Sequence, residues 1–258
     1  MELGGMVPPA ATSQINNLVE KAHTNRKYII ILAFLFNLYI TYAIGVSGRS
    51  GGETNEYLSL KYQTLITPAG WAFSIWGVIF LAQAGYVVAQ ALPEYETHTL
   101  VMEGVRNDYI GTCVAQIIWT ISFSHEYIGL SFIAMVAICY FLINILKSQY
   151  ALGSEENTWK HYGLLRFPFE LHAGWIIAAL FVNFSVWLVS LNAFSIILVT
   201  VAALTLVGIF AVAAGSLWYI LKPNFIIPFV MAWATVSFLV RSGIEKPIFS
   251  FRAAKPLS

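Results

Sequence analysis

Tryptophans and side-chain amides recur together at helical spacing in three long apolar segments of this sequence. They form three stripes, each on one face of its predicted helix: Trp76, Gln83 and Gln90; Gln116 and Trp119; Trp175 and Asn183. Aromatic walls with a few polar groups are typical of a small-molecule pocket. Amides in membrane helices also hydrogen-bond to neighbouring helices. The stripes are therefore compatible with a ligand pocket and with plain helix packing.

Acid–base groups stand close together at two places, His125–Glu126 and Glu170-x-His172. Both pairs lie at the predicted ends of apolar segments, where we expect them to contact lipid headgroups. No second histidine follows His125 at the spacing that a zinc-binding helix needs. We therefore predict neither a catalytic site nor a metal site, and we expect that the protein is not an enzyme.

Composition assigns the chain to a membrane. Of its 258 residues, 58% are hydrophobic and 10% are charged, and the mean hydropathy is +0.71. Soluble domains carry about 25% charged residues, so we predict an integral, multi-pass membrane protein. The net charge of +1 provides no basic field for nucleic acid. Both cysteines, Cys113 and Cys139, fall in apolar segments and predict no disulfide.

The apolar runs predict an all-α membrane protein, a polytopic bundle of about seven transmembrane helices. The predicted spans cover residues 28–46, 71–92, 109–123, 127–146, 168–191, 194–221 and 225–240. Residues 1–27 are predicted to form a polar tail or a short surface helix, and residues 242–258 a C-terminal tail. The transmembrane bundle would thus occupy residues 28–241.

The predicted spans exclude several functions. Aspartate, glutamate, lysine and arginine are absent from the middle of every span, whereas proton pumps, ion-coupled transporters and voltage sensors depend on such groups. A retinal protein needs a lysine in its last helix, and residues 225–240 contain none. These functions are therefore not expected here.

Three motifs resemble those of the TspO/MBR family, the tryptophan-rich sensory proteins. Residues 67–76 (TPAGWAFSIW) are similar to the proline–glycine–tryptophan start of that family's second helix. Gln116-x-x-Trp119-x-x-x-Phe123 resembles its Asn-x-x-Trp motif, with glutamine in place of asparagine. The sequence Pro168…Trp175…Asn183 resembles its Pro…Trp…Asn helix. The likeness covers residues 65–190 and implies a TspO-like core of five helices within the larger bundle.

The resemblance implies a sensor or carrier that binds a flat apolar ligand, a tetrapyrrole or a sterol, within the bundle. Carried onto this chain, the ligand-binding residues are Trp71, Phe73, Trp76, Gln83, Gln116, Trp119, Trp175 and Asn183. The expected partners are the lipid bilayer, the small apolar ligand and a second copy of the chain or other membrane subunits.

A second hypothesis is an accessory subunit of a large photosynthetic or respiratory membrane complex that holds pigment or lipid between its helices. In that case His125 is the candidate ligand of a chlorophyll magnesium. The sequence is compatible with a bacterial inner membrane and with an organelle membrane, thylakoid or mitochondrial.

Overall fold

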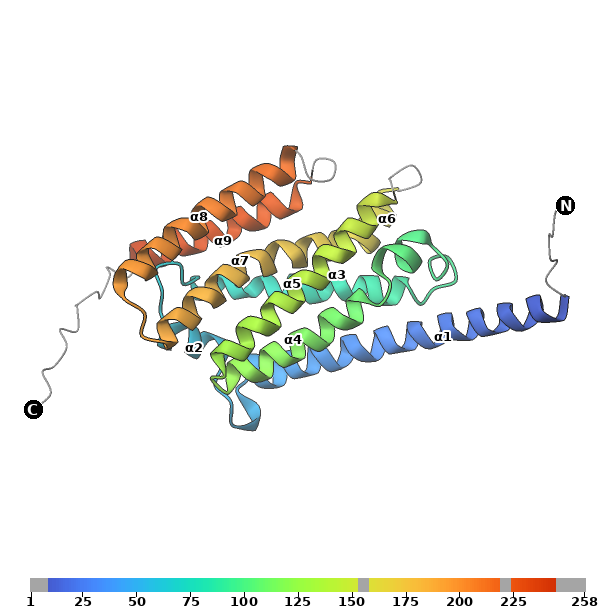
Figure 1. The fold of residues 1–258 in the computed structure, drawn as a ribbon, viewed down its shortest axis with the longest axis horizontal. Coiled ribbons are helices and arrows are strands. Elements are labelled where there is room, and N and C mark those ends of the chain that lie inside the picture. Colours follow the sequence, from blue (N-terminus) through green and yellow to red (C-terminus); the bar gives the residue numbers. More distant parts are fainter. Residues whose placement is uncertain (1–8, 153–157, 219–223, 245–258) are drawn as a thin grey trace, which may run out of the picture.

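The long helices of the protein lie side by side in an elongated bundle (Figure 1). The computed structural model describes residues 9–152, 158–218 and 224–244, and every regular element in these ranges is helical. The long helices are α1 (Pro9–Ile40), α3 (Ile75–Ala89), α4 (Asp108–Ser124), α5 (Ile128–Ala151), α7 (Phe167–Ser190), α8 (Ser195–Trp218) and α9 (Ile226–Ile244). In lipid the backbone must satisfy its own hydrogen bonds, so each apolar run becomes a helix.

Short helical turns join the long helices. The π-helical turn η1 (Thr41–Val46) continues α1, and the loop that follows contains η2 (Arg49–Gly51) and α2 (Asn55–Lys61). The remaining turns are the 3-10 helix η3 (Gly70–Ser74), the π-helical turn η4 (Leu100–Val105), α6 (Trp159–His161) and the π-helical turn η5 (Tyr162–Arg166).

Six helical segments of the described chain are long and apolar enough to cross a membrane: Asn25–Val46, Gly70–Ala89, Ile128–Ala151, Trp159–Ser190, Ser195–Leu217 and Ile226–Gly243. The protein is an integral, multi-pass membrane protein. The predicted span 109–123 corresponds to α4, which is 17 residues long and packs against α1 and α5 in the same bundle.

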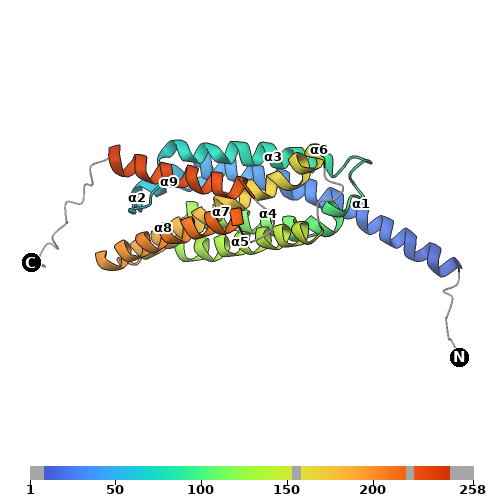
Figure 2. The same cartoon turned by 90° about the horizontal axis from the view of Figure 1, so that it is seen from above.

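The N-terminal segment differs from the predicted separate tail or surface helix. From Pro9 onward it forms one continuous helix with the first span, and α1 extends beyond the ends of its neighbours (Figures 1 and 2). No proline or glycine follows Pro9 within α1, so nothing in the backbone interrupts the helix where the sequence turns apolar. Residues 1–8 lie outside the described ranges.

The predicted polar loop 147–167 is also more helical than expected. α5 continues to Ala151, and a helix resumes at Trp159 and passes through η5 into α7. Pro168 lies in the first turn of α7, where a proline has no hydrogen bond to lose. The predicted ends at residue 221 and in the tail from 245 to 258 fall outside the described ranges.

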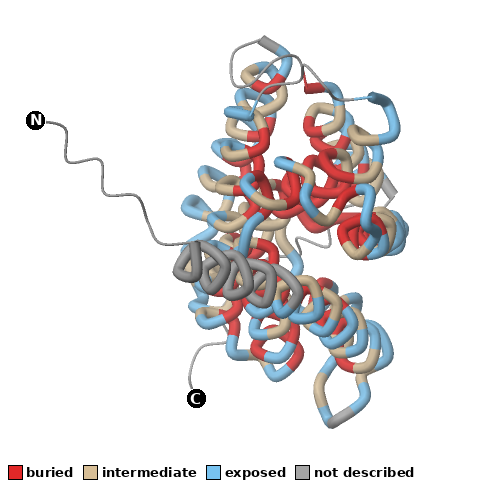
Figure 3. Tube along the Cα trace, turned by 90° about the vertical axis from the view of Figure 1, so that its right-hand side faces the viewer, coloured by how far each residue is buried: buried red, intermediate tan, exposed pale blue. Residues whose placement is uncertain are grey.

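The core lies in the middle of the bundle, where buried residues gather (Figure 3). α5 packs between α4 and α7, and α9 packs against α7 and α8. α8 is peripheral: only 17% of its most apolar stretch is buried. Its exposed side chains are large hydrophobic residues such as Leu204 and Phe210, which lipid tails solvate as well as a protein core does.

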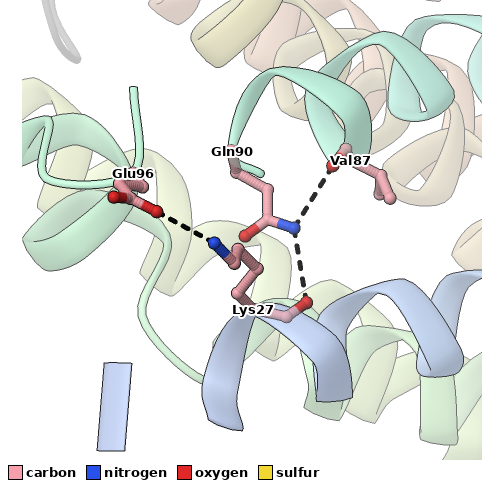
Figure 4. A network of polar contacts seen from close by, with 4 residues as sticks. All are labelled: Lys27, Val87, Gln90 and Glu96. Carbon is pink, nitrogen blue, oxygen red and sulfur yellow. Dashed lines mark hydrogen bonds and ion pairs between the residues drawn. The ribbon is translucent and has the colours of Figure 1, made fainter. Parts of the chain in front are cut away.

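A polar network fastens α1 to the end of α3 (Figure 4). The Lys27 ammonium donates to Glu96 at 2.9 Å. The Gln90 amide nitrogen lies 3.2 Å from the carbonyl of Val87 and 3.4 Å from that of Lys27. Gln90 thus closes the C-terminal end of α3 and does not extend the Trp76–Gln83 stripe into a cavity.

Candidate functional site

The segment 67–76 leads the chain into α3 in two steps. Ala69 is extended, and its N–H donates to the carbonyl of Ser237 in α9 at 3.3 Å. The next five residues form η3, and α3 begins at Ile75. Trp71 points outward: it is 41% exposed and meets Trp233 edge-on at 4.7 Å. The segment therefore joins α3 to α9 on its outer side and presents Trp76 to the interior.

Trp76 is the centre of an aromatic cluster. Its ring centroid lies 5.9 Å from Phe80, 6.3 Å from Trp119, 5.7 Å from His172 and 6.4 Å from Trp175. Trp119 lies nearly parallel to Trp76, at 28°, whereas Trp175 is turned edge-on at 84°. Helices α3, α4 and α7 thus bring the three sequence stripes together around one ring.

Beside this cluster lies a cavity of about 50 Å³, which we call the inner pocket. Its walls are almost wholly apolar and come from α2, the segment before α3, and α3, α4, α5, α7 and α9: Asn55, Ser59, Pro68, Phe73, Trp76, Trp119, Phe123, Met135, Trp175, Ala178, Ala179, Val182, Asn183, Val186, Ala234 and Phe238. Five of the eight sequence-predicted ligand-binding residues line it, namely Phe73, Trp76, Trp119, Trp175 and Asn183.

A second cavity, the outer chamber, adjoins the inner pocket and has a volume of about 270 Å³. It is lined by η1, the start of α2, η3 and the start of α3: Thr41, Tyr42, Gly45, Val46, Thr54, Asn55, Glu56, Gly70, Phe73, Ser74, Trp76, Gly77 and Phe80. Asn55, Phe73 and Trp76 line both spaces. Together the two spaces approach the size of small-molecule pockets, which begin at about 300 Å³.

Several buried polar atoms around the inner pocket have no hydrogen-bond partner within the described chain. They include the indole N–H groups of Trp119 and Trp175 and both amide atoms of Gln116. Gln116 is 0% exposed, yet it lines neither cavity. An unpartnered buried polar group costs about 1–3 kcal/mol, so these atoms mark places where a ligand or water oxygen would lower the free energy.

The other predicted amides do make contacts. Asn183 lines the inner pocket and also pairs with Ser131 of α5, with contacts of 3.4 and 3.5 Å between the two side chains. Gln83 lies outside both cavities; its amide nitrogen is 2.8 Å from Nδ1 of His172, and its oxygen accepts from the Tyr109 hydroxyl at 3.3 Å. An amide N–H only donates, so Nδ1 of His172 accepts and its proton is on Nε2.

Glu170 and His172 are buried within the bundle, which corrects the expected headgroup contact. Their exposed fractions are 1% and 0%. The two carboxylate oxygens of Glu170 accept from the Tyr150 and Tyr162 hydroxyls at 2.6 and 2.7 Å, and Asn224, two residues before α9, donates to the Tyr150 oxygen. One feature of the sequence could have predicted that His172 is buried. His172 precedes Trp175 by three residues and therefore lies on the same face of the helix.

His125 lies at the surface between α4 and α5 and lines neither cavity. Its Nδ1 is 2.9 Å from the carbonyl of Ile121 and 3.1 Å from the Ser124 hydroxyl. The next residue, Glu126, accepts from Lys61 and, at 2.6 Å, from Tyr62 of the loop that carries α2. The Lys61 ammonium and the Tyr62 hydroxyl hold the pKa of Glu126 below its ordinary value of 4.5.

Sequence reasoning missed the residues that come from the loop before α3. Asn55 and Glu56 stand in a polar stretch with no apolar periodicity, and their place beside Trp76 results from the folding of the loop over η1 and α3. Within the described residues, no group of three or more His, Cys, Asp or Glu side chains is arranged to hold a metal ion.

Comparison with known proteins gives one match. A family model described as TSPO-like protein matches residues 27–254, a range that contains both cavities and all the long helices except the start of α1. No curated protein and no solved structure matches the chain.

Proposed function

Because this chain belongs to the TSPO-like protein family, we propose that it binds a flat apolar ligand, a sterol or a tetrapyrrole, between its helices as a sensor or carrier. The observation that carries the proposal is the pair of adjoining cavities around Trp76. One is a small aromatic slot with an almost wholly apolar wall, and the other is a larger chamber with polar groups. A ligand with a flat apolar body and a polar end fits this combination.

The aromatic walls support a flat ligand. Trp76, Trp119 and Phe123 lie in nearly parallel planes, with angles of 28° and 11° between successive rings. All three line the inner pocket. Aromatic rings in a pocket wall offer flat faces and edges against which a fused ring system can pack.

The polar groups of the inner pocket support binding without chemistry on the ligand. The described residues that line it include no carboxylate, histidine, lysine or arginine, so they offer no group suited to acid–base catalysis. The indole N–H groups of Trp119 and Trp175 only donate. A ligand oxygen that accepts from one of them would satisfy a donor that the described chain leaves unpartnered.

Tryptophan fluorescence tests this function. The detergent-solubilised protein is titrated with dehydroergosterol, which accepts energy from tryptophan, and in parallel with protoporphyrin IX. We expect saturable quenching by at least one of them and an affinity about tenfold lower in Trp175→Phe, because that change removes the donor and part of the wall. Trp71→Phe is the matched control, since Trp71 packs on Trp233 outside both cavities.

Two results would contradict the proposal. One is quenching by both compounds that rises linearly without saturation, as simple partition into detergent would produce. The other is an equal loss of affinity in Trp71→Phe and Trp175→Phe, which would place the binding site outside the inner pocket.

A further inference from the structure

The charge on the walls of the two cavities is of one sign, negative. Among the described residues, Glu56 is the single charged side chain that lines the outer chamber, and none lines the inner pocket. Lysine and arginine are absent from both described linings. An anionic group that entered the chamber would therefore meet a carboxylate and no counter-ion, whereas a cation would meet its complement.

Aromatic rings surround the same space. Tyr42, Phe73, Trp76 and Phe80 all line the chamber. The ring centroid of Phe80 lies 6.0 Å from that of Tyr42 and 5.9 Å from that of Trp76. The faces of such rings attract ammonium groups, and the attraction grows when water is excluded. Rings together with one carboxylate are a set of groups suited to an organic cation.

Two glycines leave space for the polar side chains of Glu56 and Asn55. A Cβ on Gly70 would lie 3.4 Å from Oε1 of Glu56, and a Cβ on Gly45 would lie 3.0 Å from the amide nitrogen of Asn55. The amide oxygen of Asn55 is buried without a partner in the described chain. The chamber thus has the Glu56 carboxylate and the Asn55 amide in its wall, beside the aromatic rings.

We propose that the outer chamber binds an ammonium group at the polar end of a flat apolar ligand, with Glu56 as its counter-ion and the aromatic rings as its walls. The inference rests on the proposed function and narrows it. The apolar body packs against Phe73 and Trp76, which line both spaces, and the cationic end points toward α2. A ligand whose polar end is a carboxylate binds more weakly because Glu56 repels it.

A matched set of pyrene probes tests the proposal. Pyrenemethylamine, pyrenemethanol and pyrenecarboxylic acid share a flat apolar body, accept energy from tryptophan, and carry a cationic, a neutral and an anionic end. For the wild-type protein in a non-ionic detergent, we expect the amine to bind about fivefold more tightly than the alcohol and the acid to bind more weakly than both.

Substitution of the carboxylate sharpens the test. In Glu56→Gln we expect the amine to lose its about fivefold advantage while the affinity for pyrenemethanol stays the same. Glu53→Gln is the matched control, because it removes a carboxylate from the same loop that does not line the chamber. Partition of each probe into detergent is the same for every variant and so cancels in the comparison.

The outcomes distinguish a failure of the charge selection from a failure of the proposed function. Equal affinities for the three probes, or equal effects of Glu56→Gln and Glu53→Gln, would overturn the charge selection and leave the ligand pocket in place. Absence of saturable energy transfer from all three probes would instead contradict the proposed function. A melting temperature within the error of wild type shows that Glu56→Gln is folded, as expected for an exposed side chain.

The ammonium group has two sources, a free amine-bearing ligand and the choline head of a lipid. Short-chain phosphatidylcholine and phosphatidylglycerol are added separately to the protein with bound pyrenemethylamine. Displacement by the choline lipid alone identifies a lipid headgroup as the occupant. Retention of the probe in both cases identifies a free amine. Displacement by both lipids to the same extent contradicts recognition of the cation.

Discussion

The first turn of α7 and the stretch around Trp175 differ in how their buried polar groups are paired. In the first turn, both oxygens of Glu170 are occupied by tyrosine hydroxyls. Around Trp175, which lines the inner pocket as Trp119 of α4 does, the indole N–H groups of both tryptophans have no partner in the described chain. A partnered buried group stabilises the fold, whereas an unpartnered one lowers stability until something binds. The first region therefore joins helices, and the second is suited to a ligand.

The largest effect should come from breaking the partnered region. Glu170→Ala leaves the Tyr150 and Tyr162 hydroxyls without their acceptor. We expect unfolding to become easier by about 2–4 kcal/mol, seen as a lower melting temperature in detergent. Tyr150→Phe removes one of the two hydrogen bonds and should have a smaller effect. A wild-type melting temperature for Glu170→Ala would show that this cluster does not join the helices.

Two buried glutamines, Gln83 and Gln116, test the same difference between partnered and unpartnered polar groups. Gln83→Leu removes the hydrogen-bond partner of Nδ1 of His172 and one acceptor of the Tyr109 hydroxyl, and should lower stability by about 2 kcal/mol. Gln116→Leu removes two buried atoms that have no partner and should leave stability unchanged or raise it by about 1 kcal/mol. Thermal unfolding of both variants in the same detergent checks the opposite signs. A loss of stability in Gln116→Leu would mean that a bound water or ligand already satisfies its amide.

The variant Trp175→Phe distinguishes a contribution of the pocket wall to folding from a contribution to ligand binding. The indole N–H has no partner, and phenylalanine retains an aromatic ring, so we expect a change in unfolding free energy of about 1 kcal/mol. The loss of ligand affinity, about tenfold, should be clear in the quenching titration. If Trp175→Phe were strongly destabilised, we would conclude that Trp175 contributes mainly to folding and not to ligand binding.

The smallest effect is a pH dependence at the surface. The pKa of Glu126 is lowered in the folded state, so its contribution is present above the unfolded value, near 4.5, and is lost as the pH falls through the lower folded value. The group is partly exposed, so we expect a shift in melting temperature of at most about 2 °C. Glu126→Gln should lack this shift between pH 7 and pH 4; an unchanged pH profile would show that the contact with Lys61 and Tyr62 contributes nothing.

Much of the helical architecture could be predicted because hydrocarbon leaves the backbone few choices. Pro68 precedes η3 and α3, and Pro228 lies in the first turn of α9, where a helix tolerates it. The boundaries that differed are those where polar residues continue a helix, as in α1 and at the end of α5. Hydropathy detects the lipid-facing part of a helix, and polar residues extend a helix without leaving such a mark.

The site could be predicted in part. Helical spacing placed Trp76, Trp119, Trp175 and Asn183 on common faces, and all four line the inner pocket. The same spacing could not distinguish Gln83, which bridges His172 and Tyr109, from an amide that lines a cavity. Whether an amide has a partner depends on the neighbouring helix, and that neighbour is set by packing.

The sequence by itself determined the membrane location, the helical class and the aromatic stripes, because each follows from local composition and from the period of one helix. Only the tertiary structure decided that the stripes converge on Trp76, that Glu170 is buried, and that Asn55 and Glu56 line a chamber beside Trp76. These features join residues far apart in the chain, and their positions depend on how helices and loops pack rather than on any local pattern.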